Sequence, residues 1–223
     1  MIGLLLPAGR LSAQDTNKYG LFLINRPEYY CRSVKTNRDN ELVLLPADIP
    51  HMRLDIRYAT PNNFTKKALY PAALAYLRRE VTENLRNACV ELADKGYGVI
   101  IYDAYRPYSV TIEMWYSTAE KAYVANPRNG SRHNRGAAVD IGLYFLNSGQ
   151  SVDMGTDYDD FTPAASPTYG NLETDILQRR LMLFNIMRRN GFQPHPEEWW
   201  HFDFNDYNKF PIMDIPFAGI KCD

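Results

Sequence analysis

Two short segments of the chain hold residue types that could build a hydrolytic metal site. The segment Ser131–Asp140 contains His133 and Asp140, and the segment Glu198-Trp199-Trp200-His201 ends in a second histidine. Two imidazoles and one carboxylate bind zinc while leaving a fourth position for water. Glu198 lies three residues before His201, close enough to take a proton from that water. These four residues predict a small hydrolase with one zinc ion per chain.

Glu198 has a neighbouring rival, Glu197, but the position three residues before His201 favours Glu198. Trp199 and Trp200 would surround its carboxylate with low-dielectric walls. Burial there should raise its pKa towards neutrality, which suits a group that takes up a proton and returns it to a leaving amine. The alternative is a surface acidic pair beside two core tryptophans.

Arg106 follows a predicted strand and precedes a predicted helix that begins near Pro107. Functional side chains are common at such strand ends. Its guanidinium could stabilise the oxyanion of a tetrahedral intermediate. The alternative is a salt bridge, with Asp103 as a suitable partner.

The acidic segment 153–160 allows three interpretations, namely a solvated turn, a calcium loop or a binder for a substrate ammonium. Residue chemistry alone favours the turn. Calcium is the least favoured, because the glycine and terminal glutamate spacing of a calcium loop is missing. The remaining histidines, His51 and His195, are expected to be structural or exposed.

Length and composition indicate one globular domain without a nucleic-acid footprint. The 223 residues, 45% of them hydrophobic, can bury a substantial core. The 25 basic and 26 acidic side chains nearly cancel, so no nucleic-acid partner is expected. No run approaches the roughly 20 apolar residues that span a bilayer. Oligomeric state is not indicated.

The N-terminal residues bear on the compartment. Met1–Leu6 is short and apolar, and Leu11-Ser12-Ala13 resembles the small-residue end of a secretory signal, although a basic start is missing. We interpret residues 1–13 as a signal-peptide remnant, with a frayed tail as the alternative. Residues 14–41 are expected to be an extended lead-in, and residues 42–223 the zinc-binding domain. This favours a periplasmic or secreted protein, with a cytoplasmic location as the alternative.

The three cysteines, Cys31, Cys89 and Cys222, are too few for a disulfide framework. No Cys-x-x-Cys pair exists, so thiolate ligands for zinc are not expected. Cys89 falls on a predicted helix face and is expected to be a buried thiol. Cys31 and Cys222 could form one bridge in an oxidising compartment or remain free.

Hydrophobic periodicity predicts helices over residues 71–95, 107–123 and 172–190, and strands over 98–102, 137–145 and 199–204. The inward residues of the last helix are expected to be Leu177, Leu181, Phe184 and Met187. Asp140 lies on the strand face opposite an apolar row formed by Val139, Ile141 and Leu143. His201 lies opposite a second apolar row, formed by Trp200, Phe202 and Phe204. This parallel predicts that Asp140 and His201 meet.

Taken together, the segments resemble the D-alanyl-D-alanine dipeptidases of the VanX type, a family of zinc peptidases. The resemblance runs from about His51 to Phe217. The Ser-x-His and Glu-x-x-His signatures are shared across the wider group of peptidoglycan peptidases. The segments Asp55–Thr60 and Met154–Asp159 are more specific to the dipeptidases. The family implies an α+β fold in a single domain, with a small antiparallel sheet flanked by helices, as in hedgehog-like D-Ala-D-Ala peptidases.

The resemblance also implies roles, position by position. His133, Asp140 and His201 would bind zinc, Glu198 would act as general base and acid, and Arg106 would stabilise the transition state. Three further positions would line the substrate pocket: Tyr58, Ser131 and Asp159. Asp159 would meet the free ammonium of the dipeptide D-Ala-D-Ala, and a site that recognises an ammonium discriminates against substrates extended there.

Two alternatives remain open. The first is a D,D-carboxypeptidase or peptidoglycan endopeptidase of the same group, for which an ammonium-binding Asp159 would have no purpose. The second is a non-catalytic cell-wall binding module, which would need neither Glu198 nor Arg106.

Overall fold

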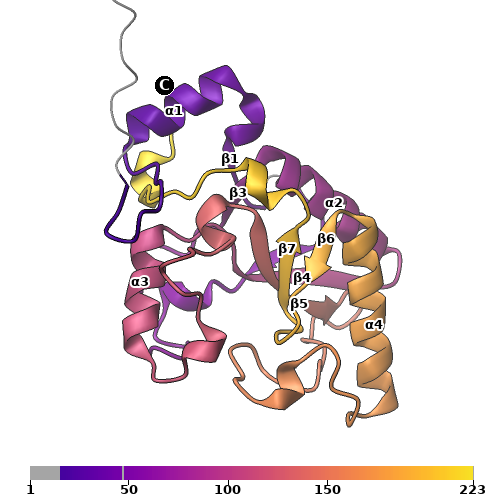
Figure 1. Ribbon diagram of the computed structural model, residues 1–223. Helices are drawn as coiled ribbons and strands as arrows, with labels where there is room; N and C mark the ends of the chain where they lie inside the picture. Colours follow the sequence, from indigo (N-terminus) through magenta and orange to yellow (C-terminus); the bar gives the residue numbers. More distant parts are fainter. Residues whose placement is uncertain (1–15, 47, 223) are drawn as a thin grey trace, which may run out of the picture.

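The computed structural model describes residues 16–46 and 48–222 (Figure 1). Its centre is a five-stranded sheet in the order β2-β4-β5-β7-β6. The strands are β2 (Met52–Leu54), β4 (Tyr97–Asp103), β5 (Ala138–Phe145), β6 (Phe192–Pro194) and β7 (His201–Phe204). The predicted antiparallel pairing holds for three neighbouring pairs of this sheet, whereas β2 and β4 run parallel.

Two long helices, α2 (Arg79–Ala93) and α4 (Thr174–Arg189), lie on one side of the sheet, and α3 (Tyr108–Ser117) lies on the other (Figure 1). This α+β arrangement is the predicted fold class. The predicted apolar stripe of α2 is confirmed, since Val81, Leu85, Ala88 and Leu92 are all buried. These residues recur at steps of three and four, which places them on one helix face.

Three helix predictions were wrong in detail. The first helix does not begin at residue 71, because Tyr76–Arg78 is instead a strand, β3, paired with β1 (Leu42–Leu44). The helix predicted over residues 107–123 ends at Ser117, where Thr118 turns to an extended backbone. In α4, Leu181 is 56% exposed. Arg180 takes an inward position instead, because its Nε donates to the Met154 carbonyl.

Short 3-10 turns connect these elements at Arg38–Asn40, Arg57–Ala59, Lys121–Tyr123, His133–Arg135, Pro163–Ala165, Tyr207–Lys209 and Phe217–Gly219. Gly136 follows one of these turns with a φ of +66°, a left-handed conformation that glycine adopts without strain. It turns the chain from His133 towards β5, which carries Asp140.

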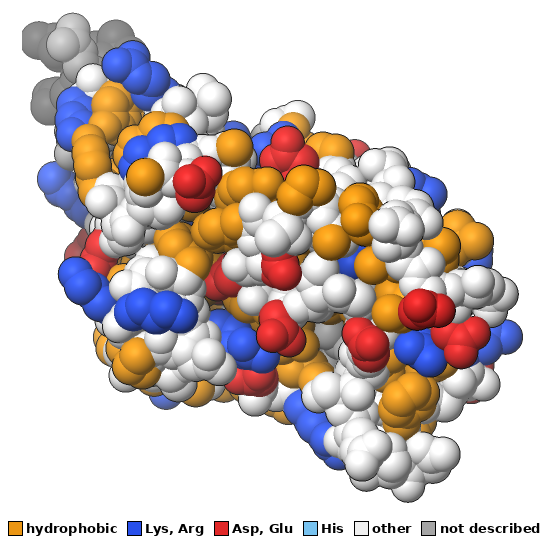
Figure 2. Space-filling view, turned by 90° about the horizontal axis from the view of Figure 1, so that it is seen from below, with side chains coloured by type: hydrophobic (Ala, Val, Ile, Leu, Met, Phe, Trp, Pro, Cys, Tyr) orange, Lys and Arg blue, Asp and Glu red, His pale blue; other side chains and the backbone are white. Residues whose placement is uncertain are grey.

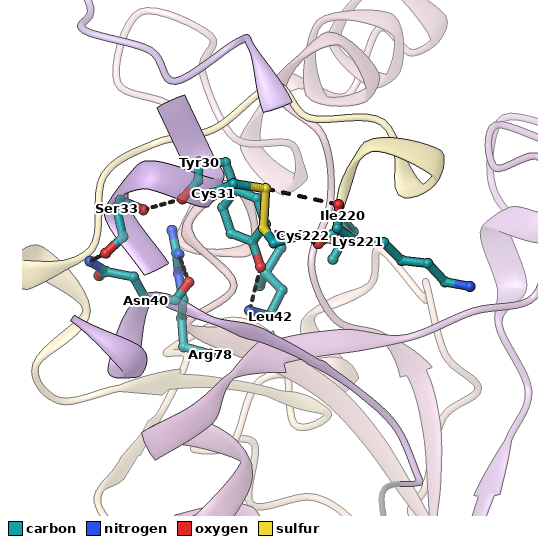
Figure 3. Close-up of a disulfide and its surroundings, with 9 residues drawn as sticks. All are labelled: Tyr30, Cys31, Ser33, Asn40, Leu42, Arg78, Ile220, Lys221 and Cys222. Carbon is teal, nitrogen blue, oxygen red and sulfur yellow. Dashed lines mark hydrogen bonds between the residues drawn. A yellow bond between two sulfur atoms is a disulfide. The ribbon is translucent and has the colours of Figure 1, made fainter. Parts of the chain in front are cut away.

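The lead-in expected to be extended contains a helix, α1 (Pro27–Thr36). Its pattern is weak in sequence because it buries few residues. Tyr30 is fully buried, and its hydroxyl accepts a hydrogen bond from the Leu42 amide. Cys31 on α1 forms a disulfide with Cys222 near the C-terminus, across a sequence separation of 191 (Figure 3). The lead-in is therefore packed onto the domain. The expected signal-peptide remnant, residues 1–13, lies outside the described residues.

The charge balance seen in the sequence also holds on the face shown in Figure 2, where basic and acidic side chains are interspersed. Within the described residues, none of the helices combines the length and hydrophobicity that crossing a bilayer requires.

Candidate active site

The three predicted ligands come from elements that meet at one end of β5 and β7. His133 begins a 3-10 turn, Asp140 lies on β5, and His201 is the first residue of β7. Asp140 and His201 are direct partners in the antiparallel register. The prediction that these two residues meet is therefore confirmed. Within the described part of the chain, these three residues form the one cluster suited to hold a metal ion.

The ligand atoms converge tightly. Asp140 Oδ1 lies 2.9 Å from His201 Nδ1 and 3.2 Å from His133 Nε2, and the two ring nitrogens are 3.1 Å apart. The corners of a tetrahedral zinc site with bonds near 2.0 Å are about 3.3 Å apart. All three side chains are buried, with 8% exposure or less. The spacing therefore fits one small cation.

The partners on the far side of each ligand fix which atom is free to bind. His133 Nδ1 donates to the Ala104 carbonyl at 2.7 Å, and His201 Nε2 donates to Asp203 Oδ1 at 2.9 Å. In neutral imidazoles, the converging nitrogens are then unprotonated. Three electron-pair donors at such short range repel one another unless a cation or proton lies between them. Partners of this kind are typical of metal-binding histidines.

Asp140 is ionised in this setting. Burial opposes its ionisation, yet His133 and His201, when their rings are protonated, lower the pKa of Asp140 well below its usual range. Its second oxygen, Oδ2, accepts a hydrogen bond from the Tyr158 hydroxyl at 2.9 Å. Oδ1 thereby remains directed at the two histidines.

Glu198 lies beside the cluster, with Oε2 at 3.8 Å from His201 Nδ1. Burial raises the pKa of Glu198 to about 8, although the nearby His201 lowers it. Trp200 is 2% exposed and borders the same cavity as Glu198, so this predicted low-dielectric wall is present, whereas the Trp199 indole donates to Thr156 Oγ1. The alternative of a surface acidic pair is wrong for Glu198, whereas Glu197 is exposed.

The predicted salt bridge between Arg106 and Asp103 is confirmed, whereas the role of Arg106 at an oxyanion stays a prediction. Its Nε and Nη2 donate to Asp103 Oδ2 at 3.0 and 2.6 Å, and the guanidinium borders the cavity that contains the cluster. Asp103 is in turn held by the Tyr70 hydroxyl at 2.7 Å and by the Ala104 amide. The ion pair therefore fixes the orientation of the positively charged guanidinium plane next to the candidate ligands.

Asp159 and Tyr58 form a second polar pair on the same cavity. The Tyr58 hydroxyl donates to both carboxylate oxygens of Asp159, at 3.0 and 3.2 Å. Burial raises the pKa of Asp159 to about 7. Its φ of +61° is unusual for a residue other than glycine, and such backbone conformations concentrate at functional sites. Of the other carboxylates of the acidic segment, Asp153 and Asp157 are exposed and Asp160 is half-buried.

Ser131 lies at the start of the loop that carries His133. Its Oγ accepts a hydrogen bond from the His133 amide at 3.2 Å, and its own amide donates to Asn134 Oδ1 at 2.7 Å. The hydroxyl proton is thus available to a ligand. Ser131 is also buried at the wall of the cavity.

The predicted site residues border one cavity of about 140 Å³. This is smaller than the pockets of roughly 300–1,000 Å³ that hold drug-sized ligands. The predicted residues that it brings together are Tyr58, Arg106, Ser131, His133, Asp140, Asp159, Glu198 and His201.

Sequence reasoning missed three supporting residues. Asp203 could have been found, because it shares the strand face of His201 two residues away. Tyr158 carried no comparable signal. His195, expected to be structural or exposed, borders the cavity with its ring 5.2 Å from that of His201. Burial lowers the pKa of His195 to about 4, so this imidazole is neutral at physiological pH.

Known proteins are similar in sequence to this chain over most of its length. The model of the family described as D-ala-D-ala dipeptidase (Peptidase_M15) matches residues 38–217. The D-alanyl-D-alanine dipeptidase of Escherichia coli (strain K12) is 30% identical over 178 residues, which cover 80% of this chain and 92% of that protein. The D-alanyl-D-alanine dipeptidase of Enterococcus faecalis is 31% identical over 203 residues, covering 81% and 98%.

Among solved structures, VanYB in complex with D-alanine-D-alanine aligns with a TM-score of 0.40 and 17% identity, over 60% of this chain and 75% of that chain. The match to the family model covers most of the chain and includes the buried His-Asp-His cluster, Glu198 and Arg106. The chain therefore belongs to the D-ala-D-ala dipeptidase family of peptidoglycan-related metallopeptidases.

Proposed function

We propose that this chain hydrolyses the dipeptide D-Ala-D-Ala, using one zinc ion held by His133, Asp140 and His201. The observation that carries the proposal is the content of one small cavity. It combines the convergent ligand atoms with Glu198 and with Asp159, a carboxylate suited to the ammonium of a very short peptide. Relatives at about 30% identity are named D-alanyl-D-alanine dipeptidases, which supports the same substrate.

When bound, zinc would polarise the scissile carbonyl and lower the pKa of a water molecule. Glu198 accepts a proton from water as the water oxygen bonds to the carbonyl carbon. When the C–N bond breaks, Glu198 donates that proton to the departing amine nitrogen, which regenerates the carboxylate. The pKa of about 8 that burial gives Glu198 suits a group that must hold a proton between these two steps.

Arg106 supplies positive charge where the carbonyl oxygen becomes negative. Because Asp103 already holds two of its nitrogens, the guanidinium need not reorient during the reaction. Preorganised charge of this kind stabilises a transition state without a reorganisation cost.

The two charged ends of the substrate require separate partners. Asp159, with Tyr58 holding its carboxylate, would bind the ammonium. Ser131, on the loop of the first ligand, would donate its hydroxyl to the substrate from the other side of the cluster. Recognition of a free ammonium favours a dipeptide over a peptide extended at that end.

A substrate panel tests the proposal. Zinc-loaded protein would be assayed with D,D-, L,D- and L,L-alanyl dipeptides and with a muropeptide that ends in D-Ala-D-Ala, by measuring released alanine. We expect turnover of the D,D-dipeptide at the highest kcat/KM, and elemental analysis should find one zinc per chain. Preference for the muropeptide would assign a D,D-carboxypeptidase instead. Retention of the dipeptide without hydrolysis would assign a binding module.

We further propose that the protein works in a periplasmic or extracellular compartment. The Cys31–Cys222 disulfide supports this, because such bonds persist in oxidising compartments and are rare in the cytosol. Protein from the native host would be trapped with a maleimide polymer under denaturing conditions. We expect one reactive thiol, Cys89, without a reductant and three with it. Three reactive thiols without a reductant would favour the cytoplasm.

A further inference from the structure

Three aromatic side chains from separate loops contact one another in a row, and the two outer ones, Phe64 and Tyr123, border the cavity. The Phe64 and Phe161 ring centroids are 5.2 Å apart, and Phe161 stacks on Tyr123 at 4.8 Å with an interplanar angle of 5°. Phe64 also meets Tyr58 edge to face at 6.1 Å. We refer to Phe64, Phe161 and Tyr123 as the aromatic wall.

The aromatic wall stands beside the carboxylate proposed to bind the substrate ammonium. Phe161 follows Asp159 by two residues, and the backbone amide of Phe64 is close enough to the Asp159 carboxylate to favour its ionised form. Phe64 and Tyr123 both border the cavity. A peptide extended beyond its ammonium nitrogen at Asp159 would therefore run into these rings.

The stacked rings of Phe161 and Tyr123 belong to two different loops, which are far apart in the sequence. Tyr123 ends the 3-10 turn that follows α3, and the residues around it, 122–125, border the cavity as well. Phe161 belongs to the loop between β5 and α4. Both rings are half-buried, and their stack is a direct contact between these two loops.

We propose that the aromatic wall sets substrate length, by closing the cavity behind the amino end of a dipeptide. This inference rests on the proposed dipeptidase function and deepens it. Asp159 supplies an attraction for the ammonium, whereas the wall supplies a steric barrier to anything longer. Specificity commonly combines an attractive and a repulsive element in this way.

The test compares D-Ala-D-Ala with its N-acetylated form in zinc-loaded wild type, Tyr123→Ala and Phe161→Ala. We expect the ratio of kcat/KM for the acetylated over the free dipeptide to rise roughly tenfold or more in both variants, as for removal of a steric block. Tyr123→Phe keeps the ring and should keep the wild-type ratio. The matched control is Phe145→Ala, which removes a half-buried ring that pairs with Tyr97 away from the cavity.

A second measurement separates this inference from the proposed reaction. In a Glu198→Gln background, calorimetry with both ligands reports binding without turnover, and Tyr123→Ala should gain affinity for the acetylated dipeptide. Phe161→Leu replaces Phe161→Ala if that variant does not fold. An unchanged ratio of affinities in folded wall variants, or equal binding of both ligands by wild type, would overturn the inference. Absence of dipeptide hydrolysis by wild type would instead count against the proposed function alone.

Discussion

The metal-ligand cluster and the ammonium-binding edge of the same cavity are built in different ways. Asp140 and His201 lie on paired strands, whose main-chain hydrogen bonds fix their positions. Asp159 and the aromatic wall lie in loops held by side-chain contacts, and Asp159 has a left-handed backbone. Rigid strands suit the bond-breaking chemistry, which tolerates little displacement, whereas loops can vary to change which substrate is accepted.

The largest effect should come from the chemical group beside the strands. Glu198→Gln removes the proton acceptor while keeping the shape of the side chain, so kcat should fall about a thousandfold. Bound zinc, measured by elemental analysis, should stay at the wild-type level because Glu198 is not among the proposed ligands. Glu197→Gln changes an exposed neighbour and serves as the control. Near-normal turnover of Glu198→Gln would remove this residue from the mechanism.

The next largest effect should come from Asp203, which supports the metal-ligand cluster through His201. Asp203→Asn weakens the hydrogen bond that orients His201, so affinity for zinc should fall roughly 10- to 100-fold. A competition titration with a chelator measures this directly. Asp206→Asn, in an exposed residue just after β7, should leave affinity unchanged. Equal affinity of Asp203→Asn and wild type would show that the strand alone positions the imidazole.

On the loop side, Asp159→Asn should raise KM for the dipeptide roughly 10- to 100-fold with a smaller change in kcat, since a charge-assisted hydrogen bond is lost. Wild-type affinity should also improve as pH rises through about 7, where Asp159 loses its proton, and the variant should lack this dependence. Asp157→Asn, in an exposed residue of the same segment, is the control. A fall in kcat alone would place Asp159 in the chemical step.

The same raised pKa has a consequence for stability in chelator-treated protein. Between about pH 4 and 7, folded Asp159 retains a proton that the unfolded chain has released, so the free energy of unfolding should fall as pH rises through this window. Asp159→Asn should flatten that slope in urea titrations. The raised pKa of Glu198, about 8, makes the free energy of unfolding fall with rising pH in the same way. It should account for part of the slope that remains in Asp159→Asn.

The smallest effect on activity should come from the disulfide. Cys31→Ser/Cys222→Ser should lower the free energy of unfolding by about 2–5 kcal/mol, because the bond closes a long loop. The kcat should stay unchanged, since neither cysteine borders the cavity. Urea unfolding with and without a reductant measures the change, and only wild type should respond to the reductant. A large loss of kcat would mean that α1 supports the site.

The part of the site carried by strands could be predicted from the sequence pattern, whereas the part carried by loops could not. The alternation of apolar residues around Asp140 and His201 was enough to predict their meeting, because a strand offers two faces only. The helix at residues 27–36 was missed, because it is only ten residues long and buries a single side chain, Tyr30, fully. Tyr123 and Phe161 belong to loops without periodicity, and their contact depends on how distant segments pack. The pocket residues Tyr58, Ser131 and Asp159 were identified by resemblance rather than by physical pattern.

The direct pairing of Asp140 with His201 makes strand alignment part of the metal site. A slip of β7 by one residue against β5 would turn His201 to the apolar side and bring Phe202 into its place. An insertion at the exposed residues Gly170 and Asn171, before α4, could be absorbed in that connecting segment, whereas a single residue gained or lost within β7 would separate the ligands. A cation shared by the two strands would in turn select the correct alignment during folding.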